Sequence, residues 1–238
     1  MGIWKAVLAV TSMLVAAAAQ ADLACDKTTY DPSFKKKELW NEPVELIVTP
    51  PRIIDGGKIL CRKDRDLQKN INTLHRIEEG SLNGVKYSLY YQDGSGSVQG
   101  VKSNALDILK DSYDSNWSTR CKVDSMDDSR WCAMSKGPLT IGIWQEHVYF
   151  ITVGSDHFPG SKVLIRTGQS QPISKLAKDS FTNAQVTSII QELKIAKTVK
   201  TRYREWPYDV DKDKEIDLFG FNEGLQIITT MYNKIGAK

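Results

Sequence analysis

The stretch of sequence that decides the fold spans residues 117–158 and reads WSTRCKVDSMDDSRWCAMSKGPLTIGIWQEHVYFITVGSDHF. Cys121 and Cys132 lie on two short segments that an acidic turn at 124–129 joins. Runs rich in Trp, Ile, Val and Tyr follow, and such runs broken by turn residues are typical of antiparallel strands. We therefore predict that a disulfide-pinned, β-rich domain begins here and continues to the C-terminus.

Strand-like runs and turns alternate through this C-terminal domain, which we place at residues 115–238. The expected strands lie at 117–123, 130–134, 140–144, 148–153, 162–166, 198–205 and 215–219. Their close spacing suggests an antiparallel β-sandwich or barrel. Residues 183–194 carry apolar side chains at helical spacing and predict one packed helix, and residues 225–230 suit a short terminal helix. The predicted fold class is mainly β with a few helices (α+β).

A smaller α+β region is expected at residues 22–92. Short strands are predicted there at 44–48, 53–54, 58–61 and 85–92, the last after the turn-forming pair Asn83-Gly84. A helix is predicted at 65–79, because four apolar residues recur at helical spacing: Leu67, Ile71, Leu74 and Ile77. Gly80 suits the end of that helix.

Residues 93–114 are interpreted as a linker between the two regions. The first part, DGSGSVQG at 93–100, is rich in Gly and Ser and predicts a domain junction or a long loop. Its glycine spacing fits no phosphate-binding pattern. Residues 103–113 suit a short helix.

The first 21 residues have the features of a signal peptide. Lys5 supplies a positive charge, residues 6–18 are apolar, and Ala19-Gln20-Ala21 fits a cleavage site. We expect cleavage near Ala21 and a periplasmic or secreted mature protein; the alternative is an uncleaved N-terminal anchor. Later in the sequence no stretch reaches the roughly 18 apolar residues of a membrane helix, so we expect no transmembrane helix in the mature chain.

Four cysteines follow the predicted cleavage site, an even number that suits two disulfides in an exported protein. Three pairings are open. We favour Cys121–Cys132 and Cys25–Cys61, because each pair falls within one expected structural unit. A zinc site is disfavoured, since the sequence contains no Cys-x-x-Cys spacing. Lipid attachment at Cys25 would leave one cysteine unpaired.

No catalytic residue and no cofactor site is predicted. Ser155, Asp156 and His157 stand together, but neighbouring residues on a strand point to opposite faces, so a catalytic triad is not expected. The alternative function is a periplasmic hydrolase or transferase with a loop Asp/His site. It would require Asp156 and His157 to converge in a pocket.

No metal site is predicted either. Asp209-x-Asp211-x-Asp213 resembles the opening of a calcium loop. Lys214 and Gly220 stand where that loop needs glycine and glutamate. A solvated, charged turn is the simpler interpretation.

An exposed binding surface is the preferred functional prediction. Trp206 and Tyr208 flank Pro207, which ends a strand and so places both aromatic side chains near an edge. Arg202 and Arg204 belong to the most basic segment of the chain, which could contact an anionic envelope partner. Aromatic and arginine side chains often anchor protein contacts. The alternative is that the aromatic side chains fill the core.

The charge balance narrows the range of partners. The formal net charge is only +3, from 32 basic and 29 acidic residues that are interspersed, so nucleic acid is not expected. We predict an exported, non-enzymatic protein that binds an unknown envelope or host component. A purely structural role in the envelope is equally compatible with the sequence.

Three ordered features resemble the invasion-associated locus B family of exported bacterial proteins. They are Trp117, Cys121, Asp127-Asp128 and Cys132; then Phe158-Pro159-Gly160 followed by 163–166; and finally the runs at 189–193, 199–203 and 218–225. The resemblance covers residues 115–233. It implies a small β-rich periplasmic or secreted protein linked to host-cell invasion or envelope function, and it brings no catalytic residues. Ala196 departs from the glycine usual in the family, and residues 22–92 match none of it.

Overall fold

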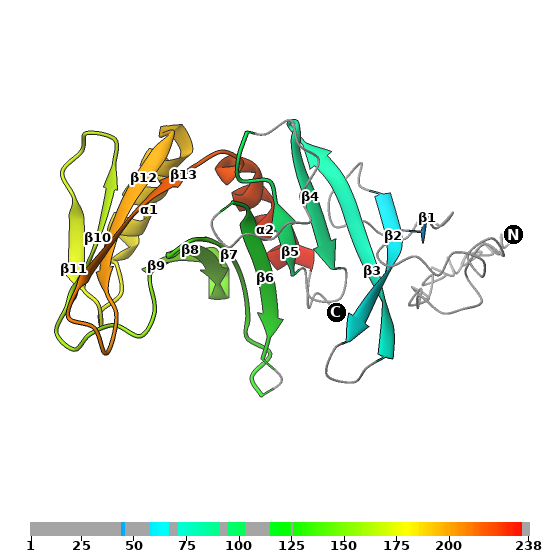
Figure 1. The fold of residues 1–238 in the computed structure, drawn as a ribbon, viewed down its shortest axis with the longest axis horizontal. Helices are drawn as coiled ribbons and strands as arrows, with labels where there is room; N and C mark the ends of the chain where they lie inside the picture. The colour runs from blue at the N-terminus through cyan, green and yellow to red at the C-terminus, as the bar shows by residue number, and fades with distance from the viewer. Residues whose placement is uncertain are drawn as a thin grey trace, which may run out of the picture.

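Two antiparallel sheets and two helices make up the described part of the chain (Figure 1). The structure is a computed structural model that describes residues 44–45, 58–66, 71–90, 95–102, 115–124 and 126–234. The predicted class, mainly antiparallel β with a few helices, is confirmed; the two sheets form a sandwich-like arrangement without a closed barrel. No helix within these residues is long and apolar enough to cross a membrane.

The large sheet has nine strands that lie in chain order. They are β1 (Val44–Glu45), β2 (Lys58–Asp66), β3 (Ile71–Leu82), β4 (Val85–Tyr90), β5 (Gly96–Val98), β6 (Trp117–Val123), β7 (Arg130–Lys136), β8 (Leu139–Trp144) and β9 (Val148–Val153). Cys121 on β6 lies directly opposite Cys132 on β7, and the two form a disulfide as predicted. The quoted stretch thus builds the last four strands of this sheet.

The second sheet has four strands in the order β11-β10-β12-β13. They are β10 (Lys162–Thr167), β11 (Ile173–Leu176), β12 (Thr198–Arg204) and β13 (Asp211–Asp217). Helix α1 (Asn183–Ile195) packs against β9 and β10, and its apolar stripe is buried as predicted. Thr182 and Gln185 cap its start by bonding each other's backbone N–H, which satisfies two otherwise free donors.

Helix α2 (Phe221–Lys234) covers the large sheet at β6, β7 and β8. The terminal helix expected at 225–230 is therefore longer than predicted. Trp117 is buried beneath it, donates from Nε1 to the carbonyl of Phe219 at 2.9 Å, and meets the Phe221 ring edge to face at 5.6 Å. This tryptophan fills the core.

A buried lysine ties the large sheet to the second one. Lys136, at the end of β7, is only 2% exposed. Its Nζ donates to the carbonyl of Asp217 at 2.7 Å and to that of Gly100, and it lies 5.7 Å from the centre of the Trp117 ring. A charge is tolerated inside a protein only where acceptors surround it, so this ammonium fixes where the end of β13 meets β7.

The helix predicted at 65–79 is wrong, because β2 ends at Asp66 and β3 runs through residues 71–82. The apolar spacing fitted a helix, but β3 hydrogen-bonds to a strand on each side. Asn83 and Gly84 both have positive φ, which makes the tight turn that folds β4 back onto β3. Gly80 ends no helix. It faces Tyr87, whose hydroxyl would lie 2.5 Å from an added Cβ.

The loop predicted at 93–100 is wrong for its central residues, which form β5 between β4 and β6. Val98 is fully buried, and the large sheet is therefore continuous from β4 to β6. Other predictions concern parts outside the described residues: the signal peptide, the helix at 103–113, and the Cys25–Cys61 disulfide, since the side chain of Cys61 is not described.

Candidate functional site

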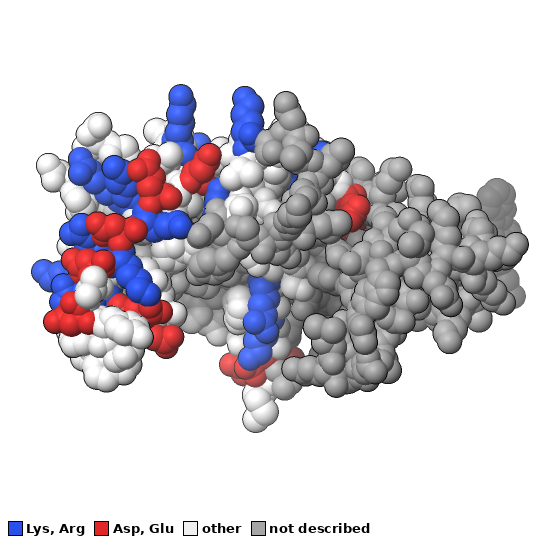
Figure 2. Space-filling view, in the orientation of Figure 1, with Lys and Arg blue, Asp and Glu red and all other residues white. Residues whose placement is uncertain are grey.

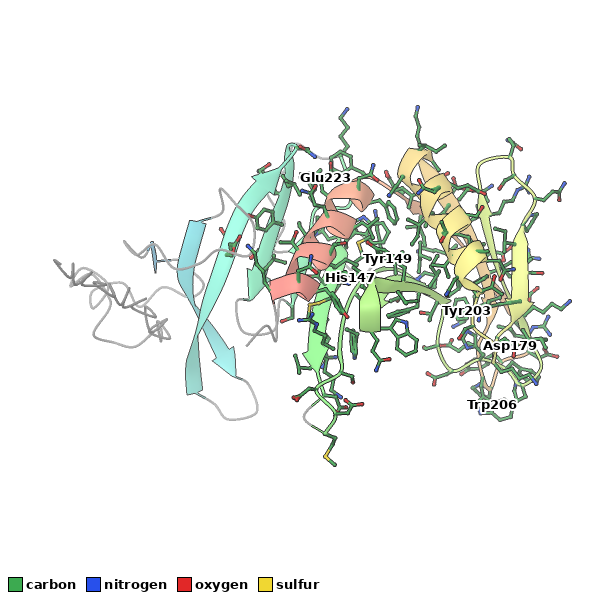
Figure 3. The ribbon with its side chains drawn as sticks, turned by 180° about the vertical axis from the view of Figure 1, so that it is seen from behind. His147, Tyr149, Asp179, Tyr203, Trp206 and Glu223 are labelled. Carbon is green, nitrogen blue, oxygen red and sulfur yellow. A yellow bond between two sulfur atoms is a disulfide. The ribbon has the colours of Figure 1, made fainter. Side chains whose placement is uncertain are left out.

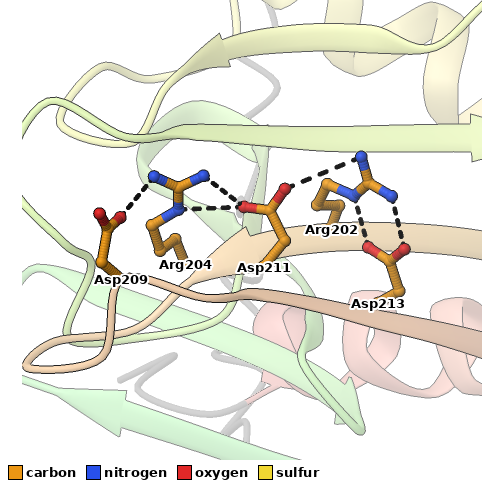
Figure 4. A network of polar contacts seen from close by, with 5 residues as sticks. All are labelled: Arg202, Arg204, Asp209, Asp211 and Asp213. Carbon is orange, nitrogen blue, oxygen red and sulfur yellow. Dashed lines mark hydrogen bonds and ion pairs between the residues drawn. The ribbon is translucent and has the colours of Figure 1, made fainter.

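The strand pair β12–β13 carries a ladder of opposite charges on one face. Arg202 lies opposite Asp213, and Arg204 lies opposite Asp211. Arg202 donates to both carboxylate oxygens of Asp213 at 2.5 Å. Arg204 donates from Nε to Asp211 at 3.0 Å and from Nη1 to Asp209 at 2.5 Å (Figure 4). Planar guanidinium groups suit such forked contacts.

The ladder shifts the pKa values of its members and leaves the face nearly neutral. Hydrogen bonding from Arg202 lowers the pKa of Asp213, and the same contact raises the pKa of Arg202. Bonding to Asp211 raises the pKa of Arg204. Lys200 adds a further pair with Glu215 at 3.6 Å. Figure 2 accordingly shows basic and acidic side chains side by side over the second sheet.

The three aspartates of the calcium-like pattern are therefore ion-pair partners of the two arginines. Asp211 and Asp213 lie on β13, and Asp209 just precedes it. Within the described residues no group of three His, Cys, Asp or Glu side chains is placed to hold a metal ion. The turn prediction is wrong for Asp211 and Asp213, which lie on a strand opposite Arg204 and Arg202. Asp209 lies in the loop before that strand.

The loop that joins β12 to β13, residues 205–210, presents three large apolar side chains to solvent. Trp206 is 56% exposed, Tyr208 63% and Val210 65%. The backbone N–H of Trp206 donates to the carbonyl of Asp156 at 2.6 Å, and its ring lies 5.5 Å from that of Phe158. We call residues 205–210 the aromatic loop. It holds the two aromatic residues that the sequence singled out, and it directly follows Arg204 in the chain. Figure 3 shows Trp206 at one end of the second sheet.

The residues of the alternative catalytic hypothesis do not converge. His157 Nε2 is bonded to the carbonyl of Val153 at 2.7 Å, and its ring packs edge to face with Tyr203. Ser155 donates to its neighbour Asp156 at 3.4 Å. In this arrangement the histidine is occupied by backbone and aromatic contacts rather than by the serine or the aspartate.

A cleft between the two sheets was not predicted from the sequence. It has a volume of about 560 Å³. We call it the intersheet cleft. Residues from β7, β8 and β9 line one side of it, and residues from β10, β11 and the segment before α1 line the other. Trp144, 50% exposed, and the half-buried Trp131 both belong to its lining.

Strand alternation was the one sequence signal for part of this cleft. Trp131, Trp144 and Phe150 occupy the strand positions that alternate with the buried Cys132, Ile143 and Ile151. The residues on the other side of the cleft, from β10 onward, are brought there only by the packing of the two sheets. No family model, curated protein or solved structure matches the chain.

Proposed function

We propose that this protein is an exported, non-enzymatic binding protein that engages a protein of the bacterial envelope or of a host through its aromatic loop. Export is supported by the signal-peptide pattern at 1–21 and by the Cys121–Cys132 disulfide, a bond typical of oxidising compartments. The resemblance to the invasion-associated locus B family points to the same class of protein.

The observation that carries the proposal is the exposure of Trp206, Tyr208 and Val210 on one loop. Isolated apolar side chains are common on protein surfaces, but grouped ones mark interaction sites. Trp and Tyr also dominate the residues that contribute most to binding between proteins. The aromatic loop is anchored at both ends, by Trp206 to Asp156 and by Arg204 to Asp209, so little conformational entropy is lost when a partner binds.

The neutral ladder indicates how the partner is held. Arg202 and Arg204 are already engaged by aspartates of this chain. Their charges are therefore largely cancelled before any partner arrives. We expect the aromatic side chains to supply most of the affinity and the binding to depend only weakly on salt. An anionic partner attracted by these arginines would instead show a steep loss of affinity with salt.

The test is partner capture by the full exported chain, purified with its disulfides intact. A partner crosslinked to the wild-type protein is identified, purified and titrated against wild type and against the double variant Trp206→Ala, Tyr208→Ala. We expect the double variant to bind at least about thirtyfold more weakly. Met126→Ala is the matched control, because Met126 is also strongly exposed but lies on the β6–β7 turn. If the folded double variant binds the partner with wild-type affinity, the aromatic loop is excluded as the binding site.

The hydrolase or transferase alternative receives no support from the contacts of His157. Its Nε2 is bonded to a backbone carbonyl, so this nitrogen is not the base for Asp156 or Ser155 in this arrangement. The binding function remains the better proposal on this geometry.

A further inference from the structure

The floor of the intersheet cleft is an apolar surface made by one face of β7, β8 and β9. Ala133, Gly142 and Phe150 face one another across these three strands. A Cβ on Gly142 would lie only 2.1 Å from the Phe150 ring, so the ring lies directly over the glycine. Trp144 and Trp131 extend the floor with two more aromatic side chains.

The floor offers few polar side-chain groups to a ligand. Thr140 and Thr152 supply its hydroxyls, and the Thr140 hydroxyl is already bonded to Ser135 at 2.8 Å. A sugar would bring many hydroxyl groups that need partners when buried. An alkyl chain needs none, so the floor suits a hydrocarbon.

The opposite wall carries a positive charge at the edge of this apolar surface. Lys175 on β11 lines the cleft and is half-buried. Its Nζ lies 4.9 Å from the centre of the Phe181 ring and donates to the carbonyl of Asp179. An ammonium has three donors. Among the described residues, the carbonyl of Asp179 is the one acceptor that is seen to bond the Lys175 ammonium. Loss of hydration lowers the pKa of Lys175 more than the nearby charge of Asp179 raises it. A bound anion would raise this pKa again.

We propose that the intersheet cleft binds a free fatty acid, with its chain on the aromatic floor and its carboxylate at Lys175. The volume of about 560 Å³ lies within the range usual for small-ligand pockets, about 300–1,000 Å³. Lys175 is the one lysine or arginine among the described residues that line the cleft, and the carboxylate of Asp179 lies in the same lining. The cleft therefore offers at most one positive charge, which suits a single carboxylate better than a multiply charged phosphate. This site is separate from the proposed partner surface and does not depend on it.

The test uses laurate and dodecanol, which have the same chain length but differ in charge. Binding to the full chain is followed by tryptophan fluorescence and calorimetry, below the concentrations at which the ligands aggregate. We expect laurate to bind about tenfold more tightly than dodecanol, as a charge-assisted hydrogen bond would allow. Affinity should rise about fourfold for each methylene between octanoate and laurate.

Two variants assign the binding to the cleft. Lys175→Met keeps the apolar stem, so it should abolish the preference for laurate while leaving dodecanol binding unchanged. Thr152→Trp fills the floor from an exposed position and should weaken both ligands at least tenfold. Lys162→Met, an exposed lysine on β10 outside the cleft, is the control and should change neither.

The proposal is overturned if laurate fails to bind folded wild type, or if Lys175→Met keeps the preference for laurate. It is equally overturned if the cleft binds phospholipid from vesicles or an oligosaccharide and not laurate. Failure of partner capture is a separate result. Lys175→Met should still capture the partner, and the Trp206→Ala, Tyr208→Ala double variant should still bind laurate.

Discussion

The Cys121–Cys132 disulfide should contribute about 3 kcal/mol to the free energy of unfolding. The two cysteines are 11 residues apart in the sequence. Closing a loop of that length removes about 9 cal/mol/K of entropy from the unfolded chain, or about 3 kcal/mol at 25 °C. The β6–β7 ladder continues on both sides of the pair. We therefore expect the sheet to form without the bond, but with lower stability.

The measurement is urea unfolding of a Cys25→Ala, Cys61→Ala chain, in which Cys121–Cys132 is the one remaining disulfide. Midpoints are compared with and without reductant, so that the oxidised and reduced forms have the same amino-acid sequence. With a slope of about 2 kcal/mol per molar urea, the midpoint should fall by about 1.5 M on reduction. A chain that also carries Cys121→Ala and Cys132→Ala should not respond to reductant.

Either of two results would refute this reasoning. A midpoint shift below about 0.3 M would mean that the unfolded chain is not constrained by the bond. A reduced chain that fails to fold at all would mean that the ladder between β6 and β7 depends on the disulfide.

Two further predictions follow from packing and charge. Gly80→Ala should lower the free energy of unfolding by about 1–3 kcal/mol, because the added Cβ would meet the Tyr87 ring. In a Tyr87→Leu background this loss of stability should be smaller. An unchanged loss in that double-mutant cycle would contradict the proposed clash. Acid should weaken the ladder: the pKa of Asp213 is lowered in the folded state, so its contribution is present above about pH 3.8 and is lost as pH falls below that value. Unfolding midpoints of wild type and Asp213→Asn should therefore converge at acid pH, and a gap that stays constant from neutral to acid pH would rule the ladder out as its cause.

The strongest local patterns predicted the fold well. Strands β6 and β9 match their predicted bounds, and helix α1 extends one residue beyond its predicted end. In each of these segments the residue pattern, the turn residues and the final packing favour the same conformation. The candidate site was half predictable, since a proline after a strand placed Trp206 and Tyr208 at an edge.

Local patterns failed where the partner of a segment decided its conformation. Residues 71–79 have helical apolar spacing, yet β2 and β4 on either side make them a strand. Residues 96–98, within the segment rich in Gly and Ser, become β5 for the same reason. The sequence predicted a basic segment at Arg202 and Arg204, because the carboxylates of β13 that neutralise them follow later in the chain.

The sequence by itself determined the β-rich class, the Cys121–Cys132 pair and the amphipathic helix α1, because these depend on residues close together in the chain. Tertiary structure alone decided the buried Lys136 and the intersheet cleft, because each of these joins segments far apart in the sequence. The neutralised arginine ladder lies within one hairpin, but it depends on the register in which β13 pairs with β12. The sequence gives the charge and hydrophobicity of each side chain, but the packing of the two sheets decides which side chains contact one another.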